Sequence, residues 1–355
     1  MDKMTSHERF TRMYQHREAD RVPILDSPWS ETIDRWVQES MPTRDYVAHF
    51  GLDKVAHISV DNSPRYEKKT IEQTEDYRIY TTSWGATLKS WTKHGSTPEF
   101  LDFTITDAEK WLEAKARMQV DDARIPWNYL KENYPRWRAE GYWISAGLWF
   151  GFDVTHSWAV GTERLLMAMI EEPEWVEDMY DTFLELDLQL LDRVWDAGYR
   201  FDEVNWPNDM GYKHNQFFSM NTFRALDKPR LQRAIAWAHN KGAVARLHSC
   251  GDINPFVPEL IGIGLDGLNP LEVKAGMDPV HLKRTYGDKL TFHGGINAVL
   301  WDKPEQIKAE IARVVPVMME NGGYIFASDH SIPENVSLKD FEGILETMRE
   351  VGTYR

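Results

Sequence analysis

The sequence predicts a (β/α)₈ TIM barrel with an N-terminal β-hairpin insertion near the barrel mouth. Short apolar runs alternate with longer segments of helical periodicity, which is the pattern of βα units. Eight such apolar runs can be counted along the chain. The chain has 355 residues, a length at which α/β barrels often form one domain with insertions. Residues 1–355 are therefore expected to form a single domain.

The elements follow one another in a regular order. The predicted strands are residues 21–25, 54–59, 141–147, 201–205, 243–248, 267–269, 290–293 and 324–327. Helical periodicity covers residues 32–40, 107–118, 127–140, 162–170, 173–197 and 222–240. Residues 62–104 depart from this pattern, because residues 77–82 and 86–91 alternate around Trp84-Gly85 as the strands of a β-hairpin would. We expect this segment to be an insertion over the barrel mouth.

Composition and charge exclude several classes of protein. The formal net charge of −15 argues against a nucleic-acid partner, because neutralising phosphates requires clustered Lys and Arg. No apolar run approaches the roughly 20 residues that span a bilayer, and the first 21 residues are too polar for a signal peptide. With Cys250 as the single cysteine, no intrachain disulfide can form. A cytoplasmic enzyme without membrane contact is expected.

Polar side chains follow the predicted strands, where the active site of a barrel forms. Many of them will simply cap helices or satisfy loop amides. The residues concerned are Asp26 and Trp29 after the first strand, Asp61 and Asn62 after the second, Trp149, Asp153 and His156 after the third, Glu203, Asn205 and Asp209 at the fourth, His248, Cys250 and Asp252 at the fifth, Asn269 and Glu272 at the sixth, His293 and Asn297 at the seventh, and Asp329 and His330 at the eighth.

His248 and Cys250 are the strongest candidates for a metal site. Positions i and i+2 of an extended chain face the same side, so the imidazole and the thiol point together into the mouth. Both groups are good zinc ligands, although a lone cysteine is more often an inert buried residue. A catalytic zinc ion usually has three protein ligands, so a third is expected from another strand end. His330 is the first choice, with His293 and Glu203 in reserve.

Several segments together resemble the uroporphyrinogen decarboxylase superfamily. They are Glu8-Arg-Phe, Asp20-Arg-Val-Pro-Ile, His248-Ser-Cys-Gly, Phe292-His-Gly-Gly-Ile-Asn and the run from Gly322 to Pro333. The likeness covers essentially the whole chain. It implies a (β/α)₈ barrel, in agreement with the strand count.

The resemblance implies one of two chemistries, which are cofactor-free decarboxylation and zinc-dependent methyl transfer with corrinoid proteins. True decarboxylases of this family carry an Arg-rich segment after the first strand. Residues 25–31 here read Leu-Asp-Ser-Pro-Trp-Ser-Glu, which would repel a polycarboxylate. The methyltransferase branch uses a His-x-Cys pair and a distant Cys, whose place aligns with His330. Fewer thiolates make zinc a stronger Lewis acid and suit an oxygen-bearing substrate.

The favoured function is therefore a zinc-dependent methyltransferase that O-demethylates a small methoxylated compound and passes the methyl group to a corrinoid (cobalamin) protein. An aromatic ether is favoured, while methylamines and methanol remain open. The alternatives are a metal-free decarboxylase or lyase, a methylcobalamin:thiol methyltransferase and a noncatalytic corrinoid-binding barrel. The oligomeric state is open, with a homodimer as one option. The candidate catalytic residues are Glu203, Asp209 and His293, the candidate substrate-binding residues are Trp29, Trp84, Trp149, Asn205 and Trp206, and the candidate zinc ligands are His248, Cys250 and His330.

Overall fold

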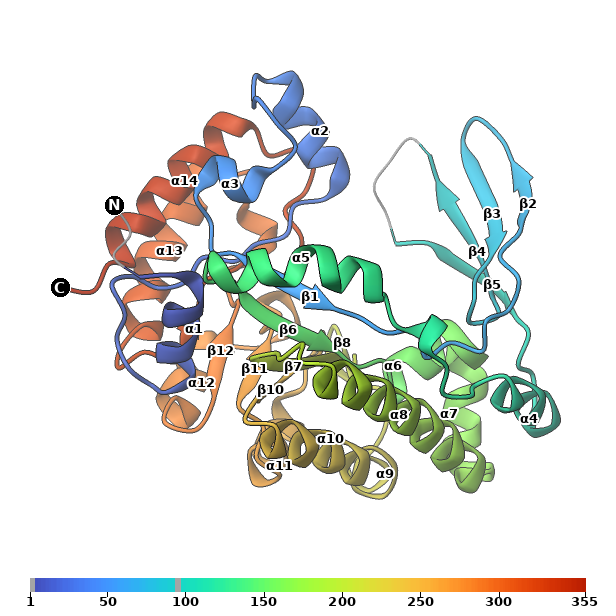
Figure 1. The fold of residues 1–355 in the computed structure, drawn as a ribbon. Helices are drawn as coiled ribbons and strands as arrows, with labels where there is room; N and C mark the ends of the chain where they lie inside the picture. Colours follow the sequence, from blue (N-terminus) through green and yellow to red (C-terminus); the bar gives the residue numbers. More distant parts are fainter. Residues whose placement is uncertain (1–3, 93–96) are drawn as a thin grey trace.

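The structure is a computed structural model that describes residues 4–92 and 97–355. Its centre is a curled parallel sheet of seven strands, and the helices lie around the outside of this sheet (Figure 1). This architecture confirms the predicted TIM-barrel fold class. In the order of the sheet, the strands are β1 (Val55–Ile58), β6 (Trp143–Gly147), β7 (Glu203–Pro207), β10 (Val244–His248), β11 (Gly267–Asn269), β12 (Thr291–His293) and β13 (Tyr324–Ile325).

Residues 21–25, predicted as the first strand, fill the eighth position of the barrel. Ile24 forms a parallel bridge with Phe326, and the backbone N–H of Asp53 donates to the Ile24 carbonyl at 3.0 Å. The segment therefore lies between β13 and β1. It is not a regular strand, because Pro23 has no N–H to donate and the N–H of Ile24 donates to the Asp53 carboxylate at 2.8 Å. The barrel closes here through isolated contacts instead of a continuous ladder.

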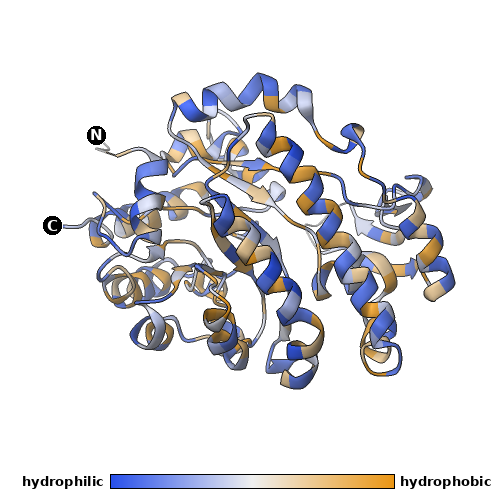
Figure 2. Ribbon diagram, turned by 60° about the horizontal axis from the view of Figure 1, so that its bottom comes forward, coloured by the Kyte–Doolittle hydropathy of each residue, from blue (hydrophilic) through white to orange (hydrophobic). Residues whose placement is uncertain are grey.

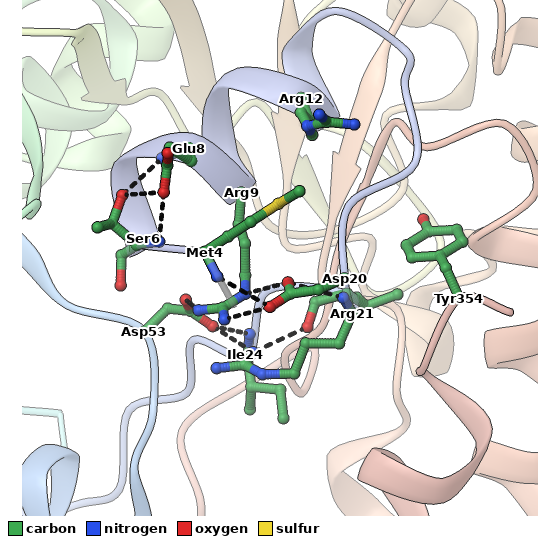
Figure 3. A network of polar contacts seen from close by, with 12 residues as sticks. Met4, Ser6, Glu8, Arg9, Arg12, Asp20, Arg21, Ile24, Asp53 and Tyr354 are labelled. Carbon is green, nitrogen blue, oxygen red and sulfur yellow. Dashed lines mark hydrogen bonds and ion pairs between the residues drawn. The ribbon is translucent and has the colours of Figure 1, made fainter. Parts of the chain in front are cut away.

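A buried network of charges holds this closing segment in place (Figure 3). Arg9, on α1 (Ser6–Tyr14), donates to the Asp20 carboxylate at 2.7 Å and to that of Asp53 at 2.9 Å. Arg21 donates to the second oxygen of Asp53 at 2.6 Å. Arg9 is 2% exposed and Asp53 is 1% exposed. Because buried charges are tolerated only when they are paired, this network ties α1 and residues 21–25 to the start of β1.

The outer helices bury one apolar stripe each against the sheet. In Figure 2, hydrophobic and hydrophilic residues alternate along these helices. In α8, for example, Val176, Met179 and Phe183 recur at helical spacing and are fully buried. Among the described residues, no helix combines the length and apolarity needed to cross a bilayer. The outer helices of the barrel are α2 (Ser30–Gln38), α3 (Tyr46–Phe50), α4 (Ala108–Ala116), α5 (Trp127–Ala139), α7 (Thr162–Glu171), α8 (Pro173–Asp196), α10 (Lys228–Asn240), α11 (Val257–Gly262), α12 (Pro279–Tyr286), α13 (Pro304–Met318) and α14 (Leu338–Val351).

The predicted hairpin is present as β3 (Tyr77–Thr81) and β4 (Ala86–Trp91), which pair antiparallel. Two further strands that were not predicted, β2 (Thr70–Gln73) and β5 (Glu99–Phe103), extend it to a four-stranded sheet. Gly85 between β3 and β4 has a φ of +94°, a conformation that glycine adopts without strain. The sheet stands to one side of the barrel, on the side away from the chain termini (Figure 1).

The predicted helix over residues 222–240 is interrupted. It consists of α9 (Met220–Thr222), a π-helical segment η3 (Phe223–Asp227) and α10. Pro229, which has no N–H to donate, lies in the first turn of α10, directly after the π-helical segment. The remaining short elements are η1 (Asp122–Arg124), α6 (Phe152–Val154), η2 (Thr155–Val160), β8 (Gly211–Tyr212), β9 (Asn215–Gln216), η4 (Asn254–Phe256), η5 (Val273–Ala275) and η6 (Ala298–Leu300).

Alternate residues of each barrel strand face the barrel axis. In β10, Ala245 and Leu247 are fully buried against the helices, whereas Arg246 and His248 are partly exposed and face the interior. α1 closes the amino-terminal end of the barrel, where Tyr14 stacks on Trp143 with ring centroids 5.6 Å apart. The opposite end is open, and the His248 side chain there is 37% exposed.

Candidate metal site

Asp209, His248 and Cys250 come together at the open end of the barrel. Cys250 Sγ lies 3.4 Å from His248 Nε2, and Asp209 Oδ1 lies 3.7 Å from the same nitrogen. Asp209 Oδ1 also accepts the backbone N–H of Cys250 at 2.7 Å. Within residues 4–92 and 97–355, this is the one group of three or more His, Cys, Asp and Glu side chains whose ligand atoms all lie within 4.8 Å of one another.

The His248 ring is fixed in one orientation by Asn269. The side-chain N–H₂ of Asn269 donates to the His293 carbonyl at 3.2 Å, so Asn269 Oδ1 faces His248 Nδ1 at 2.6 Å. Nδ1 must then carry the proton of a neutral ring, which leaves a lone pair on Nε2. That lone pair faces Cys250 and Asp209. Histidines that bind metals typically donate their other ring N–H to an acceptor of this kind, which fixes the orientation of the ring.

The loop that carries Cys250 is closely packed. Gly251 has a φ of +82°, and a Cβ at this position would lie 2.0 Å from the carbonyl carbon of Gly211. The Gly251 N–H donates to the Glu272 carboxylate at 2.6 Å. Residue 251 must therefore be glycine, and the position of the Cys250 thiol is set by the backbone on both sides.

The electrostatics of the site favour a cation. Burial, with the negative charges of Asp209, Glu272 and Asp153, raises the pKa of the Cys250 thiol well above its usual range. Burial and Asp153 also raise the pKa of Asp209, although the charge of His248 opposes this. One imidazole nitrogen, one sulfur and one carboxylate oxygen form a donor set that fits a zinc ion. Since the Asp209 and His248 side chains are 33% and 37% exposed, an open coordination position would face the mouth.

The structure places the predicted third ligand, His330, outside this group. His330 is exposed and follows β13, which is three strands away from β10 in the sheet. Its ring lies 6.0 Å from that of Trp29, which is partly exposed. Asp209, predicted as a catalytic residue, takes the third position because β7 is the direct neighbour of β10.

Glu203 is not at the carboxyl end of its strand, contrary to the prediction. It is the first residue of β7 and faces the closed end of the barrel, with a side chain 2% exposed. Arg246 Nη2 lies 2.8 Å from its carboxylate, and the Tyr14 and Ser145 hydroxyls donate to it at 2.8 and 2.7 Å. Burial alone would raise the pKa of Glu203, but these partners outweigh it and lower the pKa to about 2. Glu203 is therefore held as an ionised partner of Arg246 at the closed end of the barrel.

His293 and Asn205 both lie inside the barrel. Burial and the charge of Arg246 lower the pKa of His293 to about 3, so its imidazole is neutral at ordinary pH. The His293 Nδ1 atom is buried and has no hydrogen-bond partner among the described residues. Asn205 donates to the Ser145 hydroxyl at 2.5 Å and is partly exposed.

Two of the predicted substrate-binding tryptophans share a pocket. The rings of Trp84 and Trp149 lie 6.2 Å apart at an angle of 35°. They line a pocket of about 480 Å³ between the inserted sheet and the barrel, together with Tyr66 and Lys68. Trp206, in contrast, is fully buried on the outer face of β7 beside Phe150. This side chain points toward the helices, so the structure does not bring Trp206 together with the other predicted substrate-binding residues.

Sequence reasoning missed Arg246 and His57 as residues of the barrel interior. The alternation that selected His248 and Cys250 also places Arg246 two positions earlier on the same face of its strand. His57, in the middle of β1, is exposed although its neighbours Ala56 and Ile58 are buried. The alternation of residues was visible in both strands, but a single polar or charged residue within a strand does not by itself indicate a site.

The chain resembles known proteins over its full length. Among solved structures, a methyltransferase from Methanosarcina mazei has a TM-score of 0.66 at 17% identity and matches 98% of this chain and 99% of its own. A B12-independent methionine synthase from Shewanella sp. W3-18-1 aligns more loosely, with a TM-score of 0.44 at 12% identity over 94% of this chain and 93% of its own. No curated protein matches the sequence.

The family model of uroporphyrinogen decarboxylase (URO-D) matches residues 155–351, more than half of the chain. This range includes β7, β10 and β11, and with them Asp209, His248, Cys250 and Asn269. The resemblance seen in short sequence segments is thus confirmed by a match that contains the whole metal-site candidate. The chain belongs to the uroporphyrinogen decarboxylase family.

Proposed function

We propose that this protein is a zinc-dependent methyltransferase that removes the methyl group of a small methoxylated compound and transfers it to a corrinoid protein. The observation that carries the proposal is the triangle of Asp209, His248 and Cys250, with His248 Nε2 left free to bind a metal by the hydrogen bond from Nδ1 to Asn269. The family membership and the fold shared with a methyltransferase from Methanosarcina mazei support it. In this proposal, Asp209 replaces His330 as the third ligand.

A bound zinc ion would act as a Lewis acid that makes an ether oxygen a better leaving group. In this proposal, the residues around the metal have separate roles. Asn269 orients His248, and Glu272 holds the loop of Cys250 through the Gly251 N–H. Cys250 must lose its proton to become a ligand, and because its pKa is raised, this loss depends on the metal.

The substrate side of the proposal rests on the aromatic residues at the mouth. Trp84 and Trp149 form an apolar wall beside the opening of the barrel. Flat apolar walls with a few polar groups are typical of sites for aromatic ligands. An aromatic methyl ether is therefore the favoured substrate class.

The metal content of the purified protein tests the proposal. We expect about one zinc ion per chain, lost in His248→Ala and Cys250→Ala and strongly reduced in Asp209→Ala. His330→Ala is the matched control, because it removes an imidazole at the same end of the barrel without touching the triangle. Zinc retained in Asp209→Ala but lost in His330→Ala would reverse the ligand assignment.

Activity is tested with reduced corrinoid protein and a panel of methoxylated compounds, by following the absorbance of methylcobalamin. Methyl transfer should require the same three residues as zinc binding. A protein that turns over a carboxylic acid without metal, and is indifferent to Cys250→Ser, would instead be a decarboxylase, and the proposal would be wrong.

A further inference from the structure

Both backbone polar groups of Trp149 are bound by side chains instead of by a neighbouring strand. Trp149 lies two residues beyond the end of β6, and its N–H donates to Asp187 Oδ2 at 2.6 Å. Its carbonyl accepts the side-chain N–H of Asn62, from the loop after β1, at 2.7 Å. The same amide donates to Asp187 Oδ2 at 2.8 Å, so the three residues form a closed triangle. The backbone of Trp149 is therefore fixed, although it lies in a loop.

Asp187 reaches this triangle from the outer helix α8. It is fully buried, and its second oxygen, Oδ1, has no hydrogen-bond partner among the described residues. Burial raises the pKa of Asp187 well above its usual range, although the N–H of Trp149 opposes this. Burying an acid with one unpaired oxygen lowers the stability of a fold. Stability alone thus gives no reason for an acid at this position, whereas the placement of Trp149 does.

The same face of α8 contacts the second tryptophan of the pocket. Phe183 lies one helical turn before Asp187, on the same side of the helix. Its ring lies 5.3 Å from that of Trp84, at an angle of 51°. One turn of α8 therefore supports both Trp84 and Trp149, whose rings lie 6.2 Å apart in the pocket of about 480 Å³.

We propose that Asp187 is a positioning residue for substrate binding, which fixes Trp149 beside Trp84 in the wall of the aromatic pocket. The inference rests on the proposed function, in which these two tryptophans border the substrate. Asp187 does not line the pocket and acts only through the backbone of Trp149. The wall then has its final shape before a ligand arrives, and binding is not weakened by the need to order it.

The test compares Asp187→Leu with Asp187→Asn. Both substitutions keep the branching and the number of side-chain heavy atoms. Asparagine is uncharged and keeps an oxygen that can accept both N–H groups, whereas leucine removes the acceptor. Each protein is labelled with 5-fluorotryptophan and titrated with methoxybenzene, and its ¹⁹F NMR spectrum is recorded. The resonances of Trp84 and Trp149 are assigned from Trp84→Phe and Trp149→Phe.

Asp187→Leu should shift or broaden the Trp149 resonance and weaken methoxybenzene binding about tenfold, the size expected for the loss of one buried hydrogen bond. Asp187→Asn should keep the resonance in place and the affinity within twofold of wild type. Val194→Ala is the matched control, because Val194 is fully buried two turns further along α8. It should lower the stability in urea unfolding and leave both readouts unchanged. Asn62→Ala, which removes the donor to the Trp149 carbonyl, should act like Asp187→Leu and serves if that variant does not fold.

Three results would overturn the proposal. The first is a folded Asp187→Leu protein with an unchanged Trp149 resonance and affinity. The second is an equal loss of affinity in Val194→Ala, which would reduce the effect to general destabilisation. The third is an Asp187→Asn protein that behaves like Asp187→Leu, which would exclude the role as a hydrogen-bond acceptor.

This proposal and the proposed function can fail separately. If methylcobalamin forms and Asp187→Leu has the wild-type KM and kcat, the methyltransferase stands and the role of Asp187 falls. If methoxybenzene binding depends on Asp187 but no methyl group is transferred from any methoxylated compound, the positioning role stands and the proposed reaction falls.

Discussion

Replacing Asn269 with leucine should weaken zinc binding about tenfold to a hundredfold, or by about 1.4 to 2.7 kcal/mol. Leucine has the same branching and the same number of side-chain heavy atoms as asparagine, so the shape of the side chain is retained while the 2.6 Å contact with His248 Nδ1 is lost. Without this acceptor, the ring can rotate and can place its proton on Nε2, where the metal should bind. The His293 carbonyl also loses its donor at 3.2 Å, which adds a cost to the fold that is independent of metal.

The measurement is a competition titration of zinc against a chromogenic chelator at fixed pH. Asn297→Leu is the matched control, because Asn297 lies at the same end of the barrel and caps a short helix through the Val299 N–H. It should leave the zinc affinity unchanged. A zinc affinity within twofold of wild type in a well-folded Asn269→Leu protein would refute the role of His248 Nε2 as a ligand.

Four further predictions follow from the packing and charges described above. Gly251→Ala should destabilise the protein by more than about 2 kcal/mol in urea unfolding and impair zinc binding, since its Cβ would overlap the neighbouring backbone. Asp53→Ala should cost about 3 to 5 kcal/mol in the same assay, because it leaves two buried arginines without their shared partner. Because the pKa of Cys250 is raised, the thiol is protonated before metal binds, so zinc affinity should rise with pH, and calorimetry in buffers of different ionisation enthalpy should detect proton release. Trp149→Phe should raise the KM for an aromatic substrate, whereas Trp206→Phe should leave it unchanged.

The fold was largely predictable because the period of the apolar residues changes clearly between strands and helices. The seven strands of the barrel sheet all overlap predicted ones. Two differences have local causes that the pattern does not contain. Pro23 and the Asp53 carboxylate prevent a regular ladder over residues 21–25, and the helix expected over residues 222–240 begins with a π-helical segment just before Pro229.

Only the part of the candidate site that lies on a single strand and its loop was predictable from the sequence. His248 and Cys250 follow from alternation within a single segment, but the third member depends on which strand lies beside β10. The order of the strands in the sequence does not give the geometry of the loop that follows the neighbouring strand β7. The sequence therefore could not decide between His330 and Asp209 as the third member of the site. The orientation of Trp206, in contrast, could have been predicted from its own strand. Because Asn205 faces inward, the next residue, Trp206, must face the helices. Stricter use of parity would have removed Trp206 from the site.

The closing segment of the barrel also constrains the order in which the chain can fold. The Asp26 carboxylate, just after this segment, accepts the backbone N–H and the hydroxyl of Ser328, which lies 302 positions later in the chain. During synthesis, residues 21–25 leave the ribosome long before β13 exists, so the first part of the barrel to be made must wait for the last. Contacts this distant in sequence slow folding and leave apolar edges exposed in the meantime. The charged pairs around Asp53 can form as soon as β1 is made, and they would keep residues 21–25 beside β1 until β13 has been synthesised.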